Sequence, residues 1–148
     1  MKLEIVDLQK FYPIDKNRIK RLVAGVLKAE KKGKDTELSI VFADNKRIKE
    51  INRTFLGHNY ATDVLSFPYH EPSRKNNITG EIIVSVEMAA KLAQKRGYSI
   101  EGEVALYLIH GLLHLLGYDD KHKRDAKKMH QREGELLSNF GYSIPVPN

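Results

Sequence analysis

Two periods of hydrophobic residues alternate along the chain, and they predict different elements. Short apolar runs occupy residues 3–8, 38–42, 63–67 and 80–86, and polar or turn-forming residues bound each of them. These four segments are typical of strands, and the acids within the first run favour an edge position for it. The polar stretch at 70–79 predicts a loop between the last two strands.

Helical spacing of apolar residues predicts two helices in the first part of the chain. We expect one helix to begin after Asp15 as its N-cap and to end in the lysine-rich run before Gly33, which is the expected C′ residue. The other begins after Asp44, a second N-cap candidate. Its apolar positions, three and four residues apart, are Ile48, Ile51 and Phe55. These side chains are expected to form its buried face.

Three further helices are expected at 87–95, 102–116 and 125–140, and Gly97 ends the first of them. The middle one is apolar nearly all round, so we expect it at the centre of the fold. Strands and helices mix through the chain without a repeat or a Pro/Gly-rich linker. The sequence therefore predicts a single α/β (or α+β) domain over 1–148, with a mixed sheet of about four strands and a central buried helix.

Composition agrees with one globular domain and narrows the chemistry. The chain has 148 residues, of which 41% are hydrophobic and 30% charged, enough apolar material for a core. It contains no cysteine, which excludes disulfide scaffolds and cysteine-ligated zinc or iron–sulfur sites. The formal net charge of +6 favours anionic partners, nucleic acid before membranes.

The sequence predicts neither a secretory signal nor a membrane span. Acids interrupt the apolar residues at the N-terminus, whereas a signal peptide needs a continuous apolar stretch. The longest charge-free apolar segment, 104–116, is shorter than the ~20 residues that cross a bilayer. We therefore expect a soluble, cytoplasmic protein without a membrane partner.

The candidate chemistry lies near the end of the apolar helix, where His110 and His114 are four residues apart. That spacing places two imidazoles on one face about 6 Å apart, like the paired ligands of HExxH zinc enzymes. A single histidine in an apolar helix is more often a hydrogen-bonded core residue. Two of them in a helix otherwise almost free of polar side chains favour a metal site, because each buried imidazole needs a polar partner.

Residues beyond the helix end supply candidates for a third ligand. Gly117 stands where the helix should end, and its tolerance of positive φ allows the chain to turn back toward the histidines. The candidates in reach are Asp119, Asp120 and His122. The spacing resembles the zinc segment of metzincin metalloproteases, in which a glutamate follows the first histidine as the general base. Gly111 stands at that position here, which argues against a peptidase.

Three motifs together resemble the YbeY family. They are His-Gly-Leu-Leu-His-Leu-Leu-Gly-Tyr-Asp at 110–119, Thr-Asp-Val-Leu-Ser-Phe-Pro at 62–68 and Gly-Glu-Ile-Ile at 80–83. The resemblance implies one α/β domain with a zinc site of three histidines. It also implies a metal-dependent endoribonuclease that acts in 16S ribosomal RNA 3′-end maturation and ribosome quality control. The partners it implies are ribosomal RNA, the small ribosomal subunit and single-stranded RNA.

One departure from the family concerns the metal ligands. By position, His110 and His114 match the first two family histidines, and the third falls at Asp120. A carboxylate is an acceptable zinc ligand, so we assign Asp120 rather than its neighbours. Its negative charge makes the site more hospitable to harder ions such as Mn²⁺, so Zn²⁺ or another divalent metal is expected. His110 and His114 are then also the expected catalytic residues, through the metal they hold.

A second departure is Leu56, which stands where members of the family commonly carry an arginine. Such an arginine near the metal would clamp a phosphate and stabilise charge at the scissile phosphorus. Leucine cannot do this. The cations that can replace it by sequence position are Arg53, Arg74 and Lys121.

Other polar and aromatic residues complete the predicted site. The hydroxyls of Thr62 and Ser66 are candidates for contact with a ribose or phosphate, or for local turn and ladder bonds. Aromatic residues that can stack on unpaired bases are Tyr60, Phe67 and Tyr69, with core packing as the alternative for Phe67. Asp119 is expected either to bond a ligand imidazole or to stabilise the turn. The histidines expected to be exposed are His58, His70, His122 and His130.

Two other functions fit parts of the pattern. A peptidase or another metallohydrolase would use the same metal ligands, but this chain lacks the proton acceptor that such peptidases usually carry. A ribosome-associated factor with a structural metal requires neither the glutamate nor the family arginine. A closed structural site predicts that His114→Ala unfolds the domain, whereas an open catalytic site predicts a folded, inactive variant.

Overall fold

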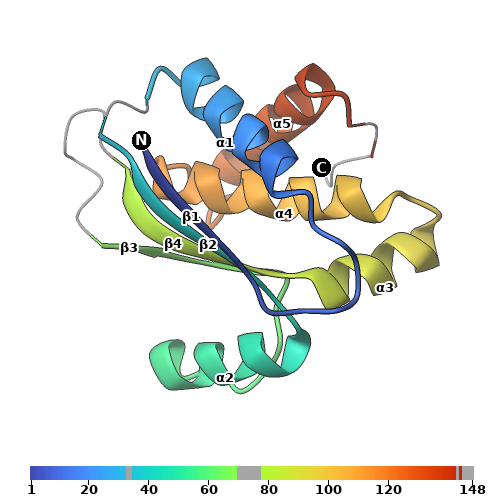
Figure 1. The fold of residues 1–148 in the computed structure, drawn as a ribbon. Helices are drawn as coiled ribbons and strands as arrows, with labels where there is room; N and C mark the ends of the chain where they lie inside the picture. The colour runs from blue at the N-terminus through green and yellow to red at the C-terminus, as the bar shows by residue number, and fades with distance from the viewer. Residues whose placement is uncertain (33–34, 70–77, 143, 145–148) are drawn as a thin grey trace.

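A four-stranded sheet with helices on both faces forms the protein (Figure 1). The computed structural model describes residues 1–32, 35–69, 78–142 and 144. Strands and helices follow the chain in the order β1 (Lys2–Asp7), α1 (Lys16–Ala29), β2 (Glu37–Ala43), α2 (Asn45–Leu56), β3 (Val64–Pro68), β4 (Thr79–Ser85), α3 (Val86–Arg96), α4 (Ile100–Leu115) and α5 (Lys123–Asn139). Apart from the end of α1, these bounds lie within two residues of the predicted ones.

The strands lie in the order β1-β2-β4-β3. β1 pairs with β2 and β2 with β4 in parallel, whereas β3 runs antiparallel to β4. The mixed four-stranded sheet and the edge position of β1 are therefore confirmed. β3 forms the opposite edge, although it comes third in the sequence. Parallel neighbours need a long crossover between them, and α1 provides one between β1 and β2.

The helices form two unequal layers. α1, α4 and α5 cover one face of the sheet, and α2 lies against the other (Figure 1). Successive side chains of a strand point to opposite faces, so β3 contributes to both layers. Ser66 of β3 hydrogen-bonds to α4, while Leu65 and Phe67 pack into the smaller apolar cluster with Ile48 of α2. Alternate side chains of β3 therefore face α4 on one side of the sheet and α2 on the other.

α4 is the buried centre of the domain, as its apolar sequence predicts. Twelve of its 16 residues are buried, and it contacts β3, β4, α3 and α5. Within the described residues, no helix is both long enough and apolar enough to cross a membrane.

Capping side chains begin α1 and α2 as predicted. The carboxylate of Asp15 accepts a hydrogen bond from the backbone N–H of Arg18 at the start of α1. The carboxylate of Asp44 accepts one from the backbone N–H of Arg47 at the start of α2. α1 ends at Ala29 with Glu30 as its C-cap, a little before the predicted end in the lysine-rich run, and the predicted C′ residue Gly33 lies outside the described residues. Glu30, the C-cap, accepts hydrogen bonds from Tyr118 and from Arg132 of α5, and the chain leaves the helix at Lys31, which has a φ of 58°.

The predicted buried face of α2 is only partly correct. Ile48 is fully buried and Ile51 half-buried, but Phe55 is 71% exposed. The last turn of α2 reaches the edge strand β3, where there is little sheet left to cover an aromatic ring. Phe55 contacts Phe67 edge-on, with ring centroids 6.1 Å apart, and otherwise faces solvent.

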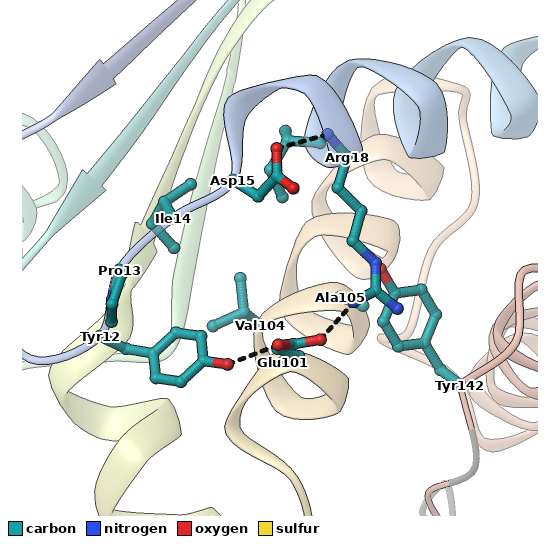
Figure 2. Close-up of a pocket in the computed structure, with 10 residues that line it drawn as sticks. Tyr12, Pro13, Ile14, Asp15, Arg18, Glu101, Val104, Ala105 and Tyr142 are labelled. Atoms are coloured by element: carbon teal, nitrogen blue, oxygen red, sulfur yellow. Dashed lines mark hydrogen bonds and ion pairs between the residues drawn. The ribbon is translucent and has the colours of Figure 1, made fainter.

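A polar cluster ties the start of α4 to α1 (Figure 2). The carboxylate of Glu101 accepts a hydrogen bond from the Tyr12 hydroxyl at 2.5 Å and forms an ion pair with Arg18. The Arg18 guanidinium lies over the Tyr142 ring, 5.0 Å from its centroid. A hollow of about 90 Å³ lies among these side chains. Each charged group of the cluster already has a partner within the protein.

Candidate metal centre

His110 and His114 project from the same side of α4, one helical turn apart. Their Nε2 atoms are 3.1 Å apart, and their ring centroids are 4.6 Å apart. The side chains are 21% and 32% exposed, so both rings border solvent although the helix is otherwise buried. The predicted placement of the two imidazoles on one face is confirmed.

A turn at Gly117 brings Asp120 back to the histidines. Gly117 has a φ of 102°, and the N–H of Tyr118 donates to the carbonyl of Leu113, which closes the helix end. Oδ2 of Asp120 then lies 3.6 Å from Nε2 of His110 and 3.7 Å from Nε2 of His114. Among the described residues, these three form the group of ligand-type side chains that could hold a metal ion.

The other two third-ligand candidates have different roles. Asp119 accepts a hydrogen bond from the backbone N–H of Lys121 and so stabilises the turn, the second of the two roles considered for it. That hydrogen bond lowers the pKa of Asp119. His122 is exposed and occupies the N-cap position of α5.

The donor set fits a small divalent cation. A tetrahedral ion with bonds of about 2.0–2.1 Å separates its ligand atoms by about 3.3–3.4 Å. The three separations of 3.1, 3.6 and 3.7 Å bracket that value. Two imidazole nitrogens and one carboxylate suit Zn²⁺ and also Mn²⁺. The ligands occupy one side of the point on which they converge, and the 41% exposed Asp120 side chain leaves the remaining side open.

Glu133 of α5 orients His110 from behind. Its carboxylate accepts a hydrogen bond from Nδ1 of His110 at 2.6 Å and another from Nδ1 of His130 at 3.0 Å. The Glu133 side chain is only 1% exposed. With Nδ1 of His110 donating, Nε2 keeps its lone pair for a metal, which is the usual carboxylate–histidine–metal arrangement. His130 is half-buried, so its predicted exposure is wrong: the bond to buried Glu133 draws it inward.

Electrostatics at His110 reflect the surrounding carboxylates. Burial, the largest single effect, lowers the pKa of His110, while the hydrogen bond and negative charge of Glu133 raise it. Asp63 and Asp120 add further negative charge, so the pKa of His110 lies above its ordinary value. The same negative field favours a bound cation.

A cleft lies beside the ligand group, between β3 and the end of α4. It encloses about 490 Å³, and its lining includes Thr62, Asp63, Val64 and Ser66 on one side and the three candidate ligands on the other. Two of the predicted substrate contacts, Thr62 and Ser66, therefore do line the cleft. The Thr62 hydroxyl donates to Asp63 at 3.2 Å, and the Ser66 hydroxyl donates to the carbonyl of Gly111 at 3.1 Å.

Two of the three cations proposed from sequence, Arg53 and Lys121, are not part of this lining. Arg53 is exposed on α2, and Lys121 is exposed next to Asp120, but neither is among the described residues that line the cleft. Arg74 and His70 lie outside the described residues. Leu56, at the position of the family arginine, is 47% exposed at the end of α2. His58 is exposed, as expected.

Gly111 shows why the peptidase glutamate is missing. A Cβ atom on Gly111 would lie 2.9 Å from Cγ2 of Ile82 and 3.0 Å from Oγ of Ser66. The residue therefore faces the sheet rather than the cleft, and the close approach of α4 to β3 requires a glycine.

Sequence reasoning missed Glu133 and Asp63. Glu133 lies four residues after buried Met129 and three before Leu136, so its position on the apolar face of α5 was a signal for a buried carboxylate. Asp63 lies within the family motif at 62–68 and accepts the N–H of Val64 through Oδ1 at 2.8 Å. Its place in the cleft depends on how β3 lies against α4.

A known protein family matches almost the whole chain. The family model described as Endoribonuclease YbeY matches residues 4–141. The chain belongs to the YbeY family. Its solved structural relatives include the solution structure of TM1509 from Thermotoga maritima, with a TM-score of 0.62, 25% sequence identity and 99% of each chain covered.

Curated relatives with the name Endoribonuclease YbeY come from several bacteria. The protein of Anaeromyxobacter sp. (strain Fw109-5) is 42% identical over 69% of this chain, and that match spans 53% of the relative, about half its length. The protein of Fusobacterium nucleatum is 38% identical over 87% of this chain and 83% of the relative. The protein of Helicobacter pylori is 42% identical over 74% and 75%.

Proposed function

We propose that this YbeY-family chain is a metal-dependent endoribonuclease that cleaves single-stranded RNA. The observation that carries the proposal is the convergence of His110, His114 and Asp120 on one point beside an open cleft. The name of the family supplies the substrate class. The finer part of the proposal is that the substrate is ribosomal RNA, at the 3′ end of 16S RNA, in the cytoplasm and in contact with the small ribosomal subunit.

The protein's own residues hold and orient the reacting groups. His110, His114 and Asp120 would bind the cation, and Glu133 fixes the ring of His110 so that Nε2 faces the cleft. A divalent ion held by these residues would supply Lewis-acid polarisation of a phosphoryl oxygen and activation of water. The exposed side of the ligand group lets a phosphodiester approach from the cleft.

Asp63 is our candidate for the proton acceptor. With glycine at position 111, Asp63 and Asp120 are the two carboxylates that line the cleft among the described residues. Oδ1 of Asp63 accepts the N–H of Val64 and the Thr62 hydroxyl, while Oδ2 has no such bond there. Asp63→Asn keeps an amide oxygen for these two bonds and removes the base, so we expect a 10²-fold or greater fall in kcat, with unchanged thermal stability.

Substrate positioning falls to groups around the cleft. The Thr62 hydroxyl donates its proton to Asp63 and the Ser66 hydroxyl donates to the carbonyl of Gly111, so each oxygen can accept a hydrogen bond from a ribose hydroxyl. Arg53 and Lys121 on the surface, together with Arg74, would hold the phosphate backbone, which provides most of the affinity for RNA. Charge reversal of Arg53 should therefore weaken RNA binding and reduce its salt dependence.

Metal identity follows from Asp120. A carboxylate ligand reduces the charge of the centre relative to three imidazoles, so we propose that Mn²⁺ competes with Zn²⁺ more effectively here than in a three-histidine site. Asp120→His provides the matched comparison. The preference between Mn²⁺ and Zn²⁺ is measured by the metal content of the two purified proteins and by competition titrations. Identical preferences in the two proteins would contradict the proposal.

Incubation with defined RNA tests the function itself. Metal-loaded protein should cleave a single-stranded RNA that carries the 16S 3′ sequence, leave the same sequence intact as a duplex, and lose activity with a chelator. A scrambled single strand separates general from ribosomal specificity. Cleavage of a peptide library without cleavage of RNA would favour the metalloprotease-like alternative. Metal binding without either activity would favour the ribosome-associated factor with a structural metal.

A further inference from the structure

Exposed large apolar side chains gather at the C-terminal end of α2. Of seven such residues in the described parts of the chain, three belong to the N-terminal segment (Met1, Leu8 and Phe11). Three more are at or just after the end of α2, namely Phe55, Leu56 and Tyr60, and the seventh, Tyr69, follows β3 and borders β1 and β2. Single exposed apolar residues are ordinary on protein surfaces, whereas a group of them marks an interaction site.

Two ring contacts organise this group at the C-terminal end of α2. Phe55 meets Phe67 of β3 edge-on, with centroids 6.1 Å apart. His58 and Tyr60, in the loop that follows α2, stack with ring planes 10° apart and centroids 5.4 Å apart. The Tyr60 hydroxyl is 3.2 Å from Nδ1 of His58. We call Phe55, His58, Tyr60 and Phe67 the α2-end aromatic cluster.

Backbone contacts hold the α2-end aromatic cluster in place. Gly57 ends α2 with a φ of 72°, and the N–H of His58 donates to the carbonyl of Asn52 at 3.2 Å. Nδ2 of Asn52, a residue that is 1% exposed, donates to the carbonyl of Tyr60 at 3.0 Å. A surface that is already ordered loses little conformational entropy when it binds a ligand.

The cluster and the cleft share the edge strand β3. Val64 and Ser66 line the cleft on the α4 side, while Phe67 points to the α2 side. Thr62, which also lines the cleft, follows Tyr60 by two residues. A flexible chain that leaves the cleft across the free edge of β3 therefore reaches the cluster.

The charge around the cluster favours a polyanion. α2 carries Lys46, Arg47, Lys49 and Arg53 against one acid, Glu50. All four cations are exposed, and none forms an ion pair with another described residue. Aromatic faces beside unpaired cations are the usual surface for single-stranded nucleic acid, because bases stack while phosphates meet the charges.

We propose that the α2-end aromatic cluster stacks one or two unpaired bases of an RNA strand that continues from the cleft, with its phosphates along the cations of α2. The proposal rests on the ribonuclease function proposed above and adds a binding subsite to it. Bases in a duplex stack on each other and expose no face to the cluster. The subsite would therefore contribute to selection of single strands.

Fluorescence of 2-aminopurine tests the stacking directly. Metal-free protein with a chelator is titrated with single-stranded RNA oligonucleotides that carry the probe at successive positions. We expect quenching at one or two adjacent positions, lost in the Phe55→Ala/Tyr60→Ala double variant. Binding should weaken by about 5- to 100-fold per ring removed. Tyr60→Phe should retain quenching, since the ring face remains.

Phe11→Ala is the matched control, because Phe11 is 49% exposed and adjoins Tyr12, which contacts the other end of α4. Its RNA binding should equal that of the wild type, and thermal melting should show that all variants fold. If the double variant binds RNA and quenches like the wild type, the subsite proposal is overturned. The subsite proposal is also overturned if the double variant changes only self-association, measured by sedimentation, and leaves RNA binding unchanged. Wild-type cleavage of RNA is scored separately: its absence alongside intact quenching refutes the ribonuclease function but not the stacking.

Discussion

The two ends of α4 carry polar clusters of opposite character. At the first turn, Glu101 is paired with Tyr12 and Arg18, and Arg18 also lies over Tyr142 (Figure 2). At the last turns, Nε2 of His110, Nε2 of His114 and Oδ2 of Asp120 converge on one point, as the ligands of a metal ion do. A cluster of satisfied partners stabilises a fold, whereas a cluster of convergent acceptors is completed by a cation.

The exposed fraction of the side chains distinguishes the two clusters less clearly than their hydrogen-bond partners do. The Arg18 and Glu101 side chains are each 43% exposed, similar to Asp120 at 41%. Two features differ. The buried carboxylate of Glu133 holds the ring of His110 by a hydrogen bond, and a cleft of about 490 Å³ lies beside the three candidate ligands. The hollow at the other end encloses only about 90 Å³. Hydrogen-bond partners, rather than surface area, therefore distinguish the candidate functional site from a structural cluster.

The largest contrast is expected from His114→Ala. Loss of one ligand should abolish stoichiometric metal binding and lower RNA cleavage by about 10³-fold or more, because positioning and charge stabilisation both depend on the ion. The domain should still fold, since a three-ligand open site contributes less to stability than a closed one. Metal analysis, cleavage assays and thermal unfolding measure this. A variant that is unfolded at room temperature would instead support a structural metal.

Gly111→Glu should damage the fold rather than restore a peptidase. Its Cβ would meet Ile82 and Ser66 at 3.0 Å or less, and its charge would be buried against the sheet. We expect the free energy of unfolding to fall by about 3–5 kcal/mol, measured by denaturant titration. Gln94→Glu, at an exposed position of α3, is the matched control and should remain near the wild type. Peptidase activity in a stable Gly111→Glu protein would contradict the placement of this residue.

Glu133→Gln should weaken the metal site without emptying it. The amide has one oxygen for two imidazole donors, and it lacks the charge that supports His110. A fall of about 10- to 100-fold in Zn²⁺ affinity is expected, measured by competition with a chelating dye. Glu135→Gln, at a 49% exposed partner of Arg132, should leave the affinity unchanged. Equal affinities in both variants would show that His110 needs no support from α5.

The smallest effect is expected at the other end of α4. Glu101→Gln keeps an acceptor for Tyr12 and loses the ion pair with Arg18, a pair too exposed to contribute more than about 1 kcal/mol. Urea titration should detect at most that change, while Zn²⁺ affinity and RNA cleavage stay at wild-type values. A shift in metal affinity would mean that the two ends of α4 are coupled.

Local chemistry accounts for the parts of the site that were predictable. His110 and His114 share a face because helical geometry fixes residues four apart, and Gly117 turns the chain because glycine tolerates positive φ. The choice of Asp120 over Asp119 came from position within a family motif. Phe55 shows the limit of such reasoning, since helical periodicity places it on the buried face but cannot show where the sheet ends.

The sequence by itself determined the elements, the caps of α1 and α2, the buried centre of α4 and the pair of histidines, because each depends on contacts within a few residues. Tertiary structure alone decided the strand order, the approach of α4 to β3 through Gly111, and the hydrogen bond from His110 to Glu133, 23 residues away. These features require segments far apart in the chain to meet, and packing of the whole core selects that meeting.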